Sequence, residues 1–436
     1  MTTTMHSSKK TFVGFGFGPI QSALFLFEAF MSGNFSRYVV AEVDAALVQA
    51  VRRNGGAYTI NIARKGVTEQ VTVRGVELYN PAVAEDRSKI IAAIGAANEL
   101  ATALPSVKFF DVGNQASVAK MLADGLSRRP SDRPAVIYAA ENHNHAAEIL
   151  LEQLRKHASA EALKGVQVLN TVVGKMSGVI GEPDVIRQLG LTTMTPATPR
   201  AILVEEFNRI LVSRITLPGF RRGIEVFVEK DDLLPFEEAK LYGHNAIHAL
   251  IGYLGELRGL TAISQAVDHP DIMQTARQAF VEESGKALIR KYAELRDPLF
   301  TPEGYRAYAD DLLERMVRPN LNDLIVRVTR DQLRKLSYDD RFFGTMRLAL
   351  RYGIAPTHMA MGAAAAVVSL VRHSGTLKDP PASLPRTASE LTESSLRDLL
   401  LEIWGETTDE HVQALIQLTW QALGSEIFRA FNQPGR

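Results

Sequence analysis

Short β-rich runs alternate with helical patterns over residues 11–175, and this alternation most constrains how the chain can fold. The predicted strands cover residues 11–16, 38–43, 57–63, 70–80, 107–112, 135–140 and 166–170. The helical patterns between them cover residues 23–33, 45–56, 86–104, 117–126 and 146–157. Strands that alternate with helices of about 10–15 residues are typical of βαβ units. The pattern therefore predicts an α/β fold with a parallel sheet.

The second half of the chain has a different pattern. Residues 176–236 mix strand-like runs with prolines, and from residue 237 onward the pattern is almost wholly helical. A chain of 436 residues also exceeds one ordinary hydrophobic core. We therefore predict a Rossmann-type dinucleotide-binding domain over residues 11–235. A mainly helical substrate-binding and catalytic domain is predicted over residues 236–436.

The amino-acid composition limits which binding partners and which cellular compartment are expected for this protein. Lys plus Arg equals Asp plus Glu, at 49 each, so no global field recruits nucleic acid or an anionic membrane. The absence of cysteine excludes disulfides, thiolate zinc sites and a cysteine nucleophile. The polar start does not look like a signal peptide, and no apolar run reaches the roughly 18 residues of a membrane span. The expectation is a cytoplasmic protein that binds neither nucleic acid nor membrane.

A glycine turn follows the first predicted strand. Gly16 and Gly18 stand where the backbone of a dinucleotide-binding domain approaches a pyrophosphate, although Gln21 replaces the third expected glycine. Glu42, twenty-six residues after Gly16, ends the second strand, where an acid suits a ribose diol and repels a 2′-phosphate. Alternatively, the turn is only a turn and Glu42 caps the next helix. The predicted cofactor is NAD, and the predicted contacts are Gly16, Phe17, Gly18, Pro19, Ile20, Glu42 and Gly113.

Polar residues interrupt the apolar face of the helix that begins near residue 237. On a regular α-helix Lys240, Asn245 and His248 fall within roughly 140° of arc, beside apolar positions. A buried ammonium is costly unless it is paired or loses its proton, and an unprotonated lysine is a general base. The helix therefore suggests proton-transfer chemistry. Individually, Lys240 could also extend to the surface, and His248 could be a satisfied core histidine.

Several blocks of sequence resemble one family. They are VAEVD after the glycine turn, IYAAENHNHAAEIL, KLYGHNAIHALIGYLGELRG, VEESGKALIRKYA and DQLRKLSYDDRFFGTMRLALRYGI. Together they resemble the polyol-specific long-chain dehydrogenases, most closely the mannitol-1-phosphate 5-dehydrogenases. The resemblance covers roughly residues 11–175 and 237–370, and it implies zinc-independent hydride transfer between NAD and a secondary alcohol of an acyclic polyol.

The resemblance assigns roles to particular residues. The family signature Lys-x4-Asn-x2-His matches Lys240, Asn245 and His248, and Glu141-Asn142 matches a further catalytic asparagine. Lys240 would be the base, while Asn142 and Asn245 would donate hydrogen bonds to the alkoxide oxygen. His248 would orient the substrate. Glu237 would pass the proton to solvent, or would be an ordinary acid at a helix start. Asn142 could instead cap a helix that begins near residue 143.

A cationic block in the helical region suggests how a substrate phosphate could be held. Arg334, Lys335 and Arg341 suit a phosphate, and similar residues occur in the sugar-phosphate members of the family. The alternative is a solvated helix face paired with aspartates. His244 and His248 stand four residues apart but lack the glutamate of a zinc-protease motif, so no metal is expected.

The leading hypothesis is an NAD-dependent, zinc-independent dehydrogenase that interconverts a phosphorylated hexitol, such as mannitol 1-phosphate, and a ketose phosphate. An unphosphorylated polyol or a sugar acid such as a hexuronate is the alternative substrate. A dinucleotide-binding sensor without catalysis is the rival from another class. The expected partner is therefore a small-molecule polyol or ketose, and the expected oligomeric state is a monomer or homodimer.

Overall fold

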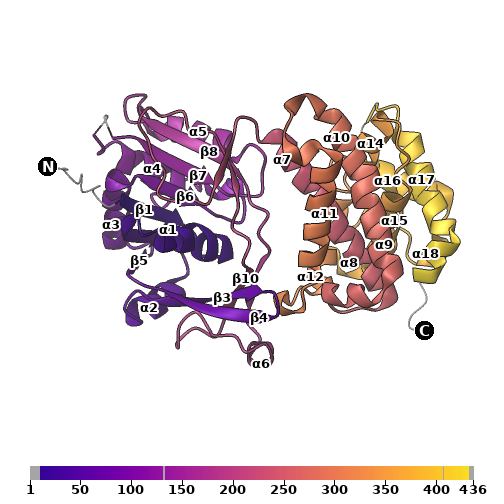
Figure 1. The fold of residues 1–436 in the computed structure, drawn as a ribbon, viewed down its shortest axis with the longest axis horizontal. Coiled ribbons are helices and arrows are strands. Elements are labelled where there is room, and N and C mark those ends of the chain that lie inside the picture. The colour runs from indigo at the N-terminus through magenta and orange to yellow at the C-terminus, as the bar shows by residue number, and fades with distance from the viewer. Residues whose placement is uncertain (1–9, 131–132, 406, 432–436) are drawn as a thin grey trace. The chain divides into compact units, whose positions relative to one another are not determined.

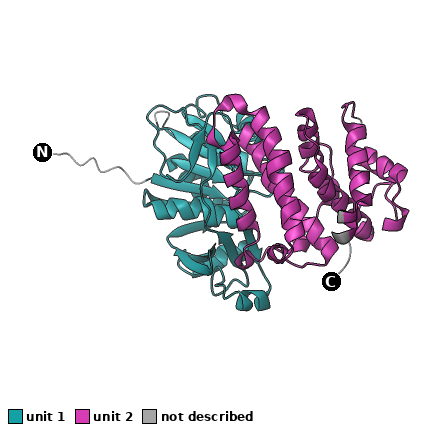
Figure 2. Cartoon of the chain, turned by 45° about the vertical axis from the view of Figure 1, so that its right-hand side comes forward, with its two compact units in different colours: residues 1–234 teal, residues 235–436 magenta. Residues whose placement is uncertain are grey.

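The computed structural model describes residues 10–130, 133–405 and 407–431, and the chain divides into two compact units. Unit 1 comprises residues 1–234 and unit 2 comprises residues 235–436, as coloured in Figure 2. The boundary predicted from the sequence lies one residue later, between 235 and 236. Each unit is described by itself.

Unit 1 is built on an eight-stranded sheet with the order β12-β11-β8-β7-β6-β1-β2-β5 (Figure 1). Its strands are β1 (Lys10–Phe15), β2 (Phe35–Ala41), β5 (Val76–Tyr79), β6 (Glu99–Thr102), β7 (Ala135–Ala139), β8 (Val166–Val172), β11 (Leu211–Ser213) and β12 (Val228–Lys230). Strands β5, β2, β1, β6, β7 and β8 run parallel, whereas β11 pairs antiparallel with β8. The parallel strands have the order of a doubly wound dinucleotide-binding sheet, which reverses between β1 and β6.

Both faces of this sheet are buried because its strands alternate between two apolar clusters. In β1, Phe12 contributes to the cluster that includes α1 (Leu26–Ser32) and α2 (Ala45–Arg53). The next residue, Val13, contributes to the cluster that includes α3 (Ala84–Ala96), α4 (Val118–Leu126) and α5 (Ala146–His157). Side chains two residues apart share a face, so near-continuous apolar strands are what a parallel sheet with two covered faces requires. The predicted α/β fold is confirmed.

A second, four-stranded sheet has the order β4-β3-β10-β9. Its strands are β3 (Tyr58–Arg64), β4 (Val67–Val73), β9 (Ser177–Ile180) and β10 (Ala201–Glu205), and the short helix α6 (Pro183–Gln188) lies between β9 and β10 in sequence. The prediction of one strand over residues 70–80 was wrong, because those residues belong to β4 and then to β5 of the larger sheet. Gly75, with φ of +74°, provides the break between the two strands.

The predictions around β6 also need correction. Residues 86–104 were predicted as one helix, but α3 ends at Ala96 and β6 pairs with both β1 and β7. The strand predicted over residues 107–112 is instead the short 3₁₀ helix η2 (Val107–Phe109) followed by a loop. Alanine, leucine and glutamate favour a helix locally, and the pairing of β6 between two buried strands overrides that preference.

Unit 2 is almost wholly helical. Its helices are α7 (Leu234–Glu238), η3 (Ala239–Asn245), α8 (Ala246–Arg258), η4 (Ile263–Asp268), α9 (Pro270–Gln278), η5 (Ala279–Gly285), α10 (Lys286–Lys291), η6 (Ala293–Leu295), η7 (Pro298–Phe300), α11 (Pro302–Met316), η8 (Pro319–Leu321), α12 (Ile325–Thr329), α13 (Gln332–Lys335), α14 (Phe343–Arg351), α15 (Thr357–Arg372), η9 (Ser374–Thr376), η10 (Ala388–Glu390), α16 (Glu393–Trp404), α17 (Val412–Gly424) and α18 (Glu426–Phe431). Helices α8 and α15 are largely buried and pack together at its centre. Among the residues that the structure describes, no helix is long and apolar enough to cross a bilayer.

Candidate active site

The glycine turn lies at the carboxyl end of β1, beside the point where the strand order of the sheet reverses. Gly16 has φ of +81°, and a Cβ atom there would lie 2.9 Å from the carbonyl oxygen of Ala103. A Cβ atom at Gly18 would meet nothing within 4 Å. Gly16 is therefore required by the backbone itself, whereas Gly18 leaves open space over the start of the helix. This is the arrangement that a dinucleotide pyrophosphate needs.

Glu42 follows β2 and holds the same turn. One carboxylate oxygen accepts a hydrogen bond of 2.7 Å from the backbone nitrogen of Phe17, and the other accepts one of 2.8 Å from that of Asp44. The alternative in which Glu42 caps α2 is wrong, because Asp44 is the N-cap and accepts from the backbone nitrogen of Leu47 at 3.0 Å. Each oxygen of Glu42 keeps further acceptor capacity, which a ribose hydroxyl could use.

Gln21 occupies the position of the missing glycine and begins the π-helical segment η1 (Gln21–Phe25). Its side chain is fully buried, and within the described structure neither of its amide atoms has a hydrogen-bond partner. A Cβ atom at Gly14 would lie 2.4 Å from its Nε2 atom. The carboxamide of Gln21 thus packs against the backbone of β1 at Gly14, where there is no side chain. The carbonyl oxygen of Ser22, in the same π-helical segment, accepts a hydrogen bond of 2.6 Å from the Tyr58 hydroxyl.

The other predicted cofactor contacts lie in two places. Phe17 is buried and packs edge-on against Tyr58 at 4.9 Å, while Pro19 and Ile20 are half-buried at the start of the helix. Gly113 lies on an exposed loop with φ of +75°, and its nitrogen donates to Asp111 Oδ1 at 2.9 Å. Because the strand predicted before Gly113 is absent, this residue does not follow a sheet strand as the sequence suggested.

Asn142 follows β7 at the carboxyl edge of the sheet, and it is exposed. The preceding Glu141 is buried and accepts hydrogen bonds of 2.9 Å from the Thr102 hydroxyl and from the backbone nitrogen of Leu104. Burial raises the pKa of Glu141 above its ordinary value, although these donors oppose the shift. Helix α5 begins at Ala146, so Asn142 is not its cap. Glu141 anchors the segment, and Asn142 is presented at the edge where ligands of such sheets bind.

Helices α7, η3 and α8 run consecutively, and the middle segment is π-helical. Lys240 and Asn245 lie in η3, and His248 lies in the first turn of α8. The arc expected from the sequence assumed a regular α-helix, whereas Ala239–Asn245 is π-helical. A π-helix bonds residues five apart and is often found at functional sites. Gly243 gives the segment room, since a Cβ atom there would lie 2.8 Å from the Tyr305 hydroxyl.

Lys240 is partly buried, and this environment favours its neutral amine over the charged ammonium form. Burial lowers its pKa to about 8, with the nearby Arg341 acting in the same direction and Glu237 opposing both. At pH 8 about half of such an amine is unprotonated, which suits a general base. Glu237 is half-buried one helical turn earlier, and it is the carboxylate whose charge reaches Lys240.

His248 has a partner that sequence reasoning missed. Its Nε2 atom lies 2.7 Å from Oδ2 of Asp323, a buried residue between η8 and α12. Asp323 is 75 residues away in sequence and stands in no recognisable motif, so no local signal pointed to it. His244 is buried, and burial together with nearby positive groups lowers its pKa well below the ordinary value. A neutral His244 therefore packs beside His248, with ring centroids 6.3 Å apart.

The three predicted phosphate contacts separate in the structure. Arg341 donates through Nε to Oδ1 of Asp340 at 2.7 Å, and its Nη1 atom lies 3.5 Å from the carbonyl oxygen of Asn245. Arg334 reaches the other oxygen of Asp340 at 3.0 Å. Only 11% of the Arg341 side chain is exposed, against 51% for Arg334. Arg341 thus lies against the helix that carries Lys240, and Asp340 links the two arginines.

Lys335 turns inward instead of facing a ligand. Its side chain is buried, and its ammonium group donates to the carbonyl oxygens of Val328 and Arg330 and lies 5.7 Å from the centre of the Tyr253 ring. These contacts satisfy carbonyls at the end of α12, which is a structural role. The assignment of Lys335 to a substrate phosphate needs correction for this reason. Burial and the neighbouring Arg341 and Arg334 lower its pKa to about 7.

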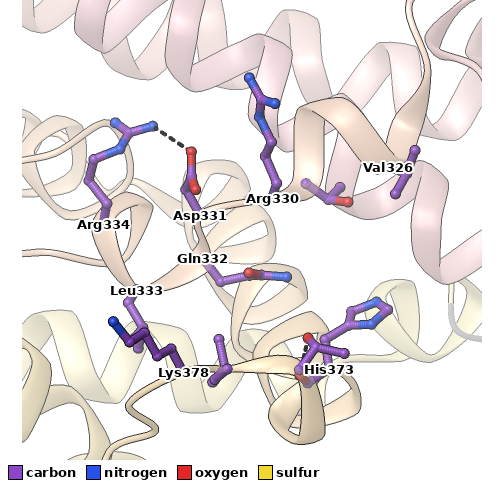
Figure 3. A pocket seen from close by; sticks show the side chains of 11 residues that line it. Val326, Arg330, Asp331, Gln332, Leu333, Arg334, His373 and Lys378 are labelled. Atoms are coloured by element: carbon purple, nitrogen blue, oxygen red, sulfur yellow. Dashed lines mark hydrogen bonds and ion pairs between the residues drawn. The ribbon is translucent and has the colours of Figure 1, made fainter. Parts of the chain in front are cut away.

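Arg334 lines a pocket of about 770 Å³ on unit 2 (Figure 3). The lining residues are Val326, Thr329, Arg330, Asp331, Gln332, Leu333, Arg334, His373, Thr376, Leu377 and Lys378. Arg334 points toward Asp331, whereas the charged ends of Arg330 and Lys378 lie apart from it. The cations of this pocket do not gather on one point, which a phosphate grip requires.

No group of three or more His, Asp or Glu side chains among the described residues is arranged to hold a metal ion. His143 and His145 form a ring pair with centroids 6.1 Å apart on an exposed segment, and the His143 ring accepts from the backbone nitrogen of His145 at 3.0 Å. The expected absence of a metal stays a prediction.

Comparison with known proteins identifies the family. The family model for the mannitol dehydrogenase C-terminal domain matches residues 232–423. A mannitol-1-phosphate 5-dehydrogenase from Bacillus licheniformis is 30% identical over 385 residues, which cover 87% of this chain and 91% of that protein. The chain belongs to the mannitol dehydrogenase family. The resemblance inferred from the sequence motifs is confirmed, and the chain is a dehydrogenase of this family.

Two solved structures of dehydrogenases share the fold of this mannitol dehydrogenase family member. One is a D-sorbitol dehydrogenase in substrate-free form, with a TM-score of 0.76, 16% identity and coverage of 98% of this chain and 95% of that one. The other is the Pseudomonas fluorescens mannitol 2-dehydrogenase in a ternary complex with NAD and D-mannitol, with a TM-score of 0.69, 16% identity and coverage of 97% and 94%. At this identity the likeness concerns the fold.

Proposed function

We propose that this protein oxidises a secondary alcohol of a phosphorylated hexitol, such as mannitol 1-phosphate, to the ketose phosphate with NAD, and catalyses the reverse reaction. The observation that carries the proposal is Lys240, a partly buried lysine whose pKa is lowered to about 8, on the helix that also bears Asn245 and His248. The family assignment supports the same reaction class.

Each group has a defined task in the proposed reaction. The unprotonated amine of Lys240 takes the proton of the reacting hydroxyl. Asn245 donates amide hydrogens to the oxygen as negative charge develops on it. NAD, when bound, accepts the hydride. Burial keeps the pKa of Lys240 low, with Arg341 acting in the same direction, and Glu237 then takes the proton from Lys240 and releases it to solvent.

The proposed cofactor site belongs to unit 1. Gly16 allows the tight turn and Gly18 leaves space over the helix start, where the pyrophosphate would be held. Glu42 would accept hydrogen bonds from the ribose hydroxyls. The carboxylate of Glu42 would repel a 2′-phosphate, which favours NAD over NADP. The Pseudomonas fluorescens mannitol 2-dehydrogenase, which shares this fold, binds NAD in its ternary complex, in agreement with this choice.

The groups that the residues supply support a mechanism without zinc. In zinc-dependent alcohol oxidation the metal commonly acidifies the hydroxyl and stabilises the alkoxide. Here Lys240 would provide the base, and the amide of Asn245 would provide hydrogen-bond donors for the alkoxide. The chain also contains no cysteine for a thiolate site. We therefore propose a mechanism in which side chains alone perform both tasks.

A phosphorylated substrate is favoured by the Bacillus licheniformis relative, which is a mannitol-1-phosphate 5-dehydrogenase. Arg341 offers a partly buried guanidinium beside the catalytic helix for the phosphate. An unphosphorylated polyol is the second candidate, because the structural neighbours are a D-sorbitol dehydrogenase and a mannitol 2-dehydrogenase.

The test is NADH formation with a panel of hexitol phosphates, hexitols and hexuronates at equal concentration. We expect the largest kcat/KM with a hexitol phosphate. A preference for a free hexitol or a sugar acid would replace the substrate assignment and leave the lysine mechanism standing. NAD binding without turnover of any compound would contradict the enzymatic proposal and favour a dinucleotide sensor.

Replacing Arg341 by methionine is expected to raise KM for the hexitol phosphate by about 10- to 100-fold, since a charged hydrogen bond contributes about 1.5–3 kcal/mol. KM for the free hexitol should change little. The matched control is Arg334→Met, because Arg334 shares Asp340 but is half exposed. An equal rise in KM for phosphorylated and free hexitols in the Arg341→Met variant would contradict the phosphate contact. A fall in kcat for both substrates would instead reflect Lys240, whose pKa Arg341 helps to lower.

A further inference from the structure

We propose that Asp323 is a positioning residue for His248, which it holds as the tautomer with the proton on Nε2, so that Nδ1 is the nitrogen that accepts a hydrogen bond from a substrate hydroxyl. The role of this tautomer in catalysis rests on the proposed function. The tautomer itself can be measured without cofactor or substrate.

The hydrogen bond between His248 and Asp323 is short, and both side chains are largely buried. His248 Nε2 and Asp323 Oδ2 are 2.7 Å apart, and 16% and 5% of the two side chains are exposed. The other oxygen of Asp323 accepts from the guanidinium of Arg327, with Nε at 3.1 Å. The two carboxylate oxygens are therefore divided, one for the imidazole and one for the arginine.

The backbone of Asp323 is held as well. Its carbonyl oxygen accepts a hydrogen bond of 2.8 Å from the backbone nitrogen of Ile263, and the next residue, Leu324, forms a β-bridge with Ala262. The preceding Asn322 adopts a left-handed conformation with φ of +48°. The segment between η8 and α12 is thus fixed on both sides of Asp323, which limits the directions from which its carboxylate can approach His248.

The charge of Asp323 decides which ring nitrogen carries the proton. Burial raises the pKa of Asp323, but the positive charges of a protonated His248 and of Arg327 outweigh burial and lower it. When His248 is neutral, Arg327 still donates to Oδ1 of Asp323 and favours the ionised carboxylate. An ionised carboxylate can only accept hydrogen bonds. Nε2 of a neutral His248 must then be the donor, and Nδ1 is left as an acceptor. A carboxylate that orients an imidazole in this way is a recurring device in enzymes.

Arg327 allows a direct test, because it fixes the orientation of an amide introduced at position 323. In an Asp323→Asn variant, Arg327 can only donate, so the amide oxygen should face Arg327 and the amide nitrogen should face His248. The imidazole would then accept at Nε2 and carry its proton on Nδ1. In the double variant Asp323→Asn, Arg327→Met the amide is free to turn, and the original tautomer should return.

The experiment uses the full chain labelled with ¹⁵N-histidine and reads the tautomer from two-bond ¹H–¹⁵N NMR correlations at a pH where the ring is neutral. The chain has 10 histidines, so a His248→Gln sample assigns the signal. We expect Nε2–H in the native protein, Nδ1–H in Asp323→Asn and Nε2–H in the double variant. We also expect kcat to fall about 10- to 100-fold in Asp323→Asn, with partial recovery in the double variant.

A purely structural ion pair would lower the melting temperature of Asp323→Asn and leave the tautomer unchanged, which would overturn the proposal. Nδ1–H in the native protein would overturn it too, even if the Asp323→Asn variant does not fold. A tautomer switch with unaltered kcat would remove the positioning role. Failure of the proposed function would instead appear as absent turnover of every polyol by the native protein, with the tautomer pattern intact.

Discussion

Replacing Lys240 by methionine is expected to lower kcat for alcohol oxidation by about 10²- to 10⁴-fold, the usual contribution of a positioned general base. NAD affinity should be nearly unchanged, because the proposed cofactor contacts lie in unit 1. Folding should be preserved, since methionine has a similar length and removes the cost of burying an ammonium group. Steady-state kinetics and NAD titration measure the two effects separately.

The pH profile gives the same experiment a second readout. The active form of Lys240 is the unprotonated amine, and its pKa is about 8. Log kcat/KM of the native enzyme should therefore rise with pH and level off above about 8, and Lys240→Met should lose this limb. Lys291→Met is the matched control, because Lys291 pairs at 2.7 Å with Glu238 of α7, and it should keep both rate and profile. Full activity of Lys240→Met would show that another group is the base.

Replacing Gly16 by alanine is expected to weaken NAD binding by at least about tenfold and to lower stability. An L-residue at φ of +81° costs about 1–2 kcal/mol, and the new Cβ atom would also press on the carbonyl oxygen of Ala103 from 2.9 Å. The turn must shift to relieve this contact, and it shifts where the pyrophosphate is proposed to bind. Calorimetric titration with NAD and thermal unfolding measure the two losses.

Gly33→Ala separates strain from cofactor binding. Gly33 has φ of +68° at the end of α1, and a Cβ atom there meets nothing within 4 Å. Its replacement should cost stability in a similar way but leave NAD affinity as it is. If both variants bind NAD with native affinity, the glycine turn is not the cofactor site.

Sequence reasoning succeeded where local pattern and tertiary environment agree. The first strand, the glycine turn and the acid at the end of β2 follow each other as predicted. It failed at β6, where all four residues are buried and Glu99 accepts from the Tyr138 hydroxyl at 2.9 Å. Nothing local marks Glu99–Thr102 as a central strand, because its partners β1 and β7 impose that conformation.

The candidate site shows the same division. Lys240, Asn245 and His248 were found because they lie within nine residues of sequence and share a segment. Asp323 was missed because only the folded helical unit brings it to His248. Lys335 was misjudged because a cluster of cations in the sequence does not show which of them faces a ligand and which one caps a helix. Local spacing predicts residues on one element, whereas partners from distant elements require the fold.

Because Ala239–Asn245 is π-helical, the direction of Lys240 relative to His248 depends on the number of residues in this segment. Removing one residue there would restore regular α-helical bonding, which is the more favourable local geometry. It would also rotate everything before the deletion by about 100° relative to His248. In the regular α-helix, Lys240 would therefore point in a different direction from the one that it has now relative to His248. If Lys240 is the base as proposed, relatives that differ here by one residue should have lost or rebuilt their proton acceptor.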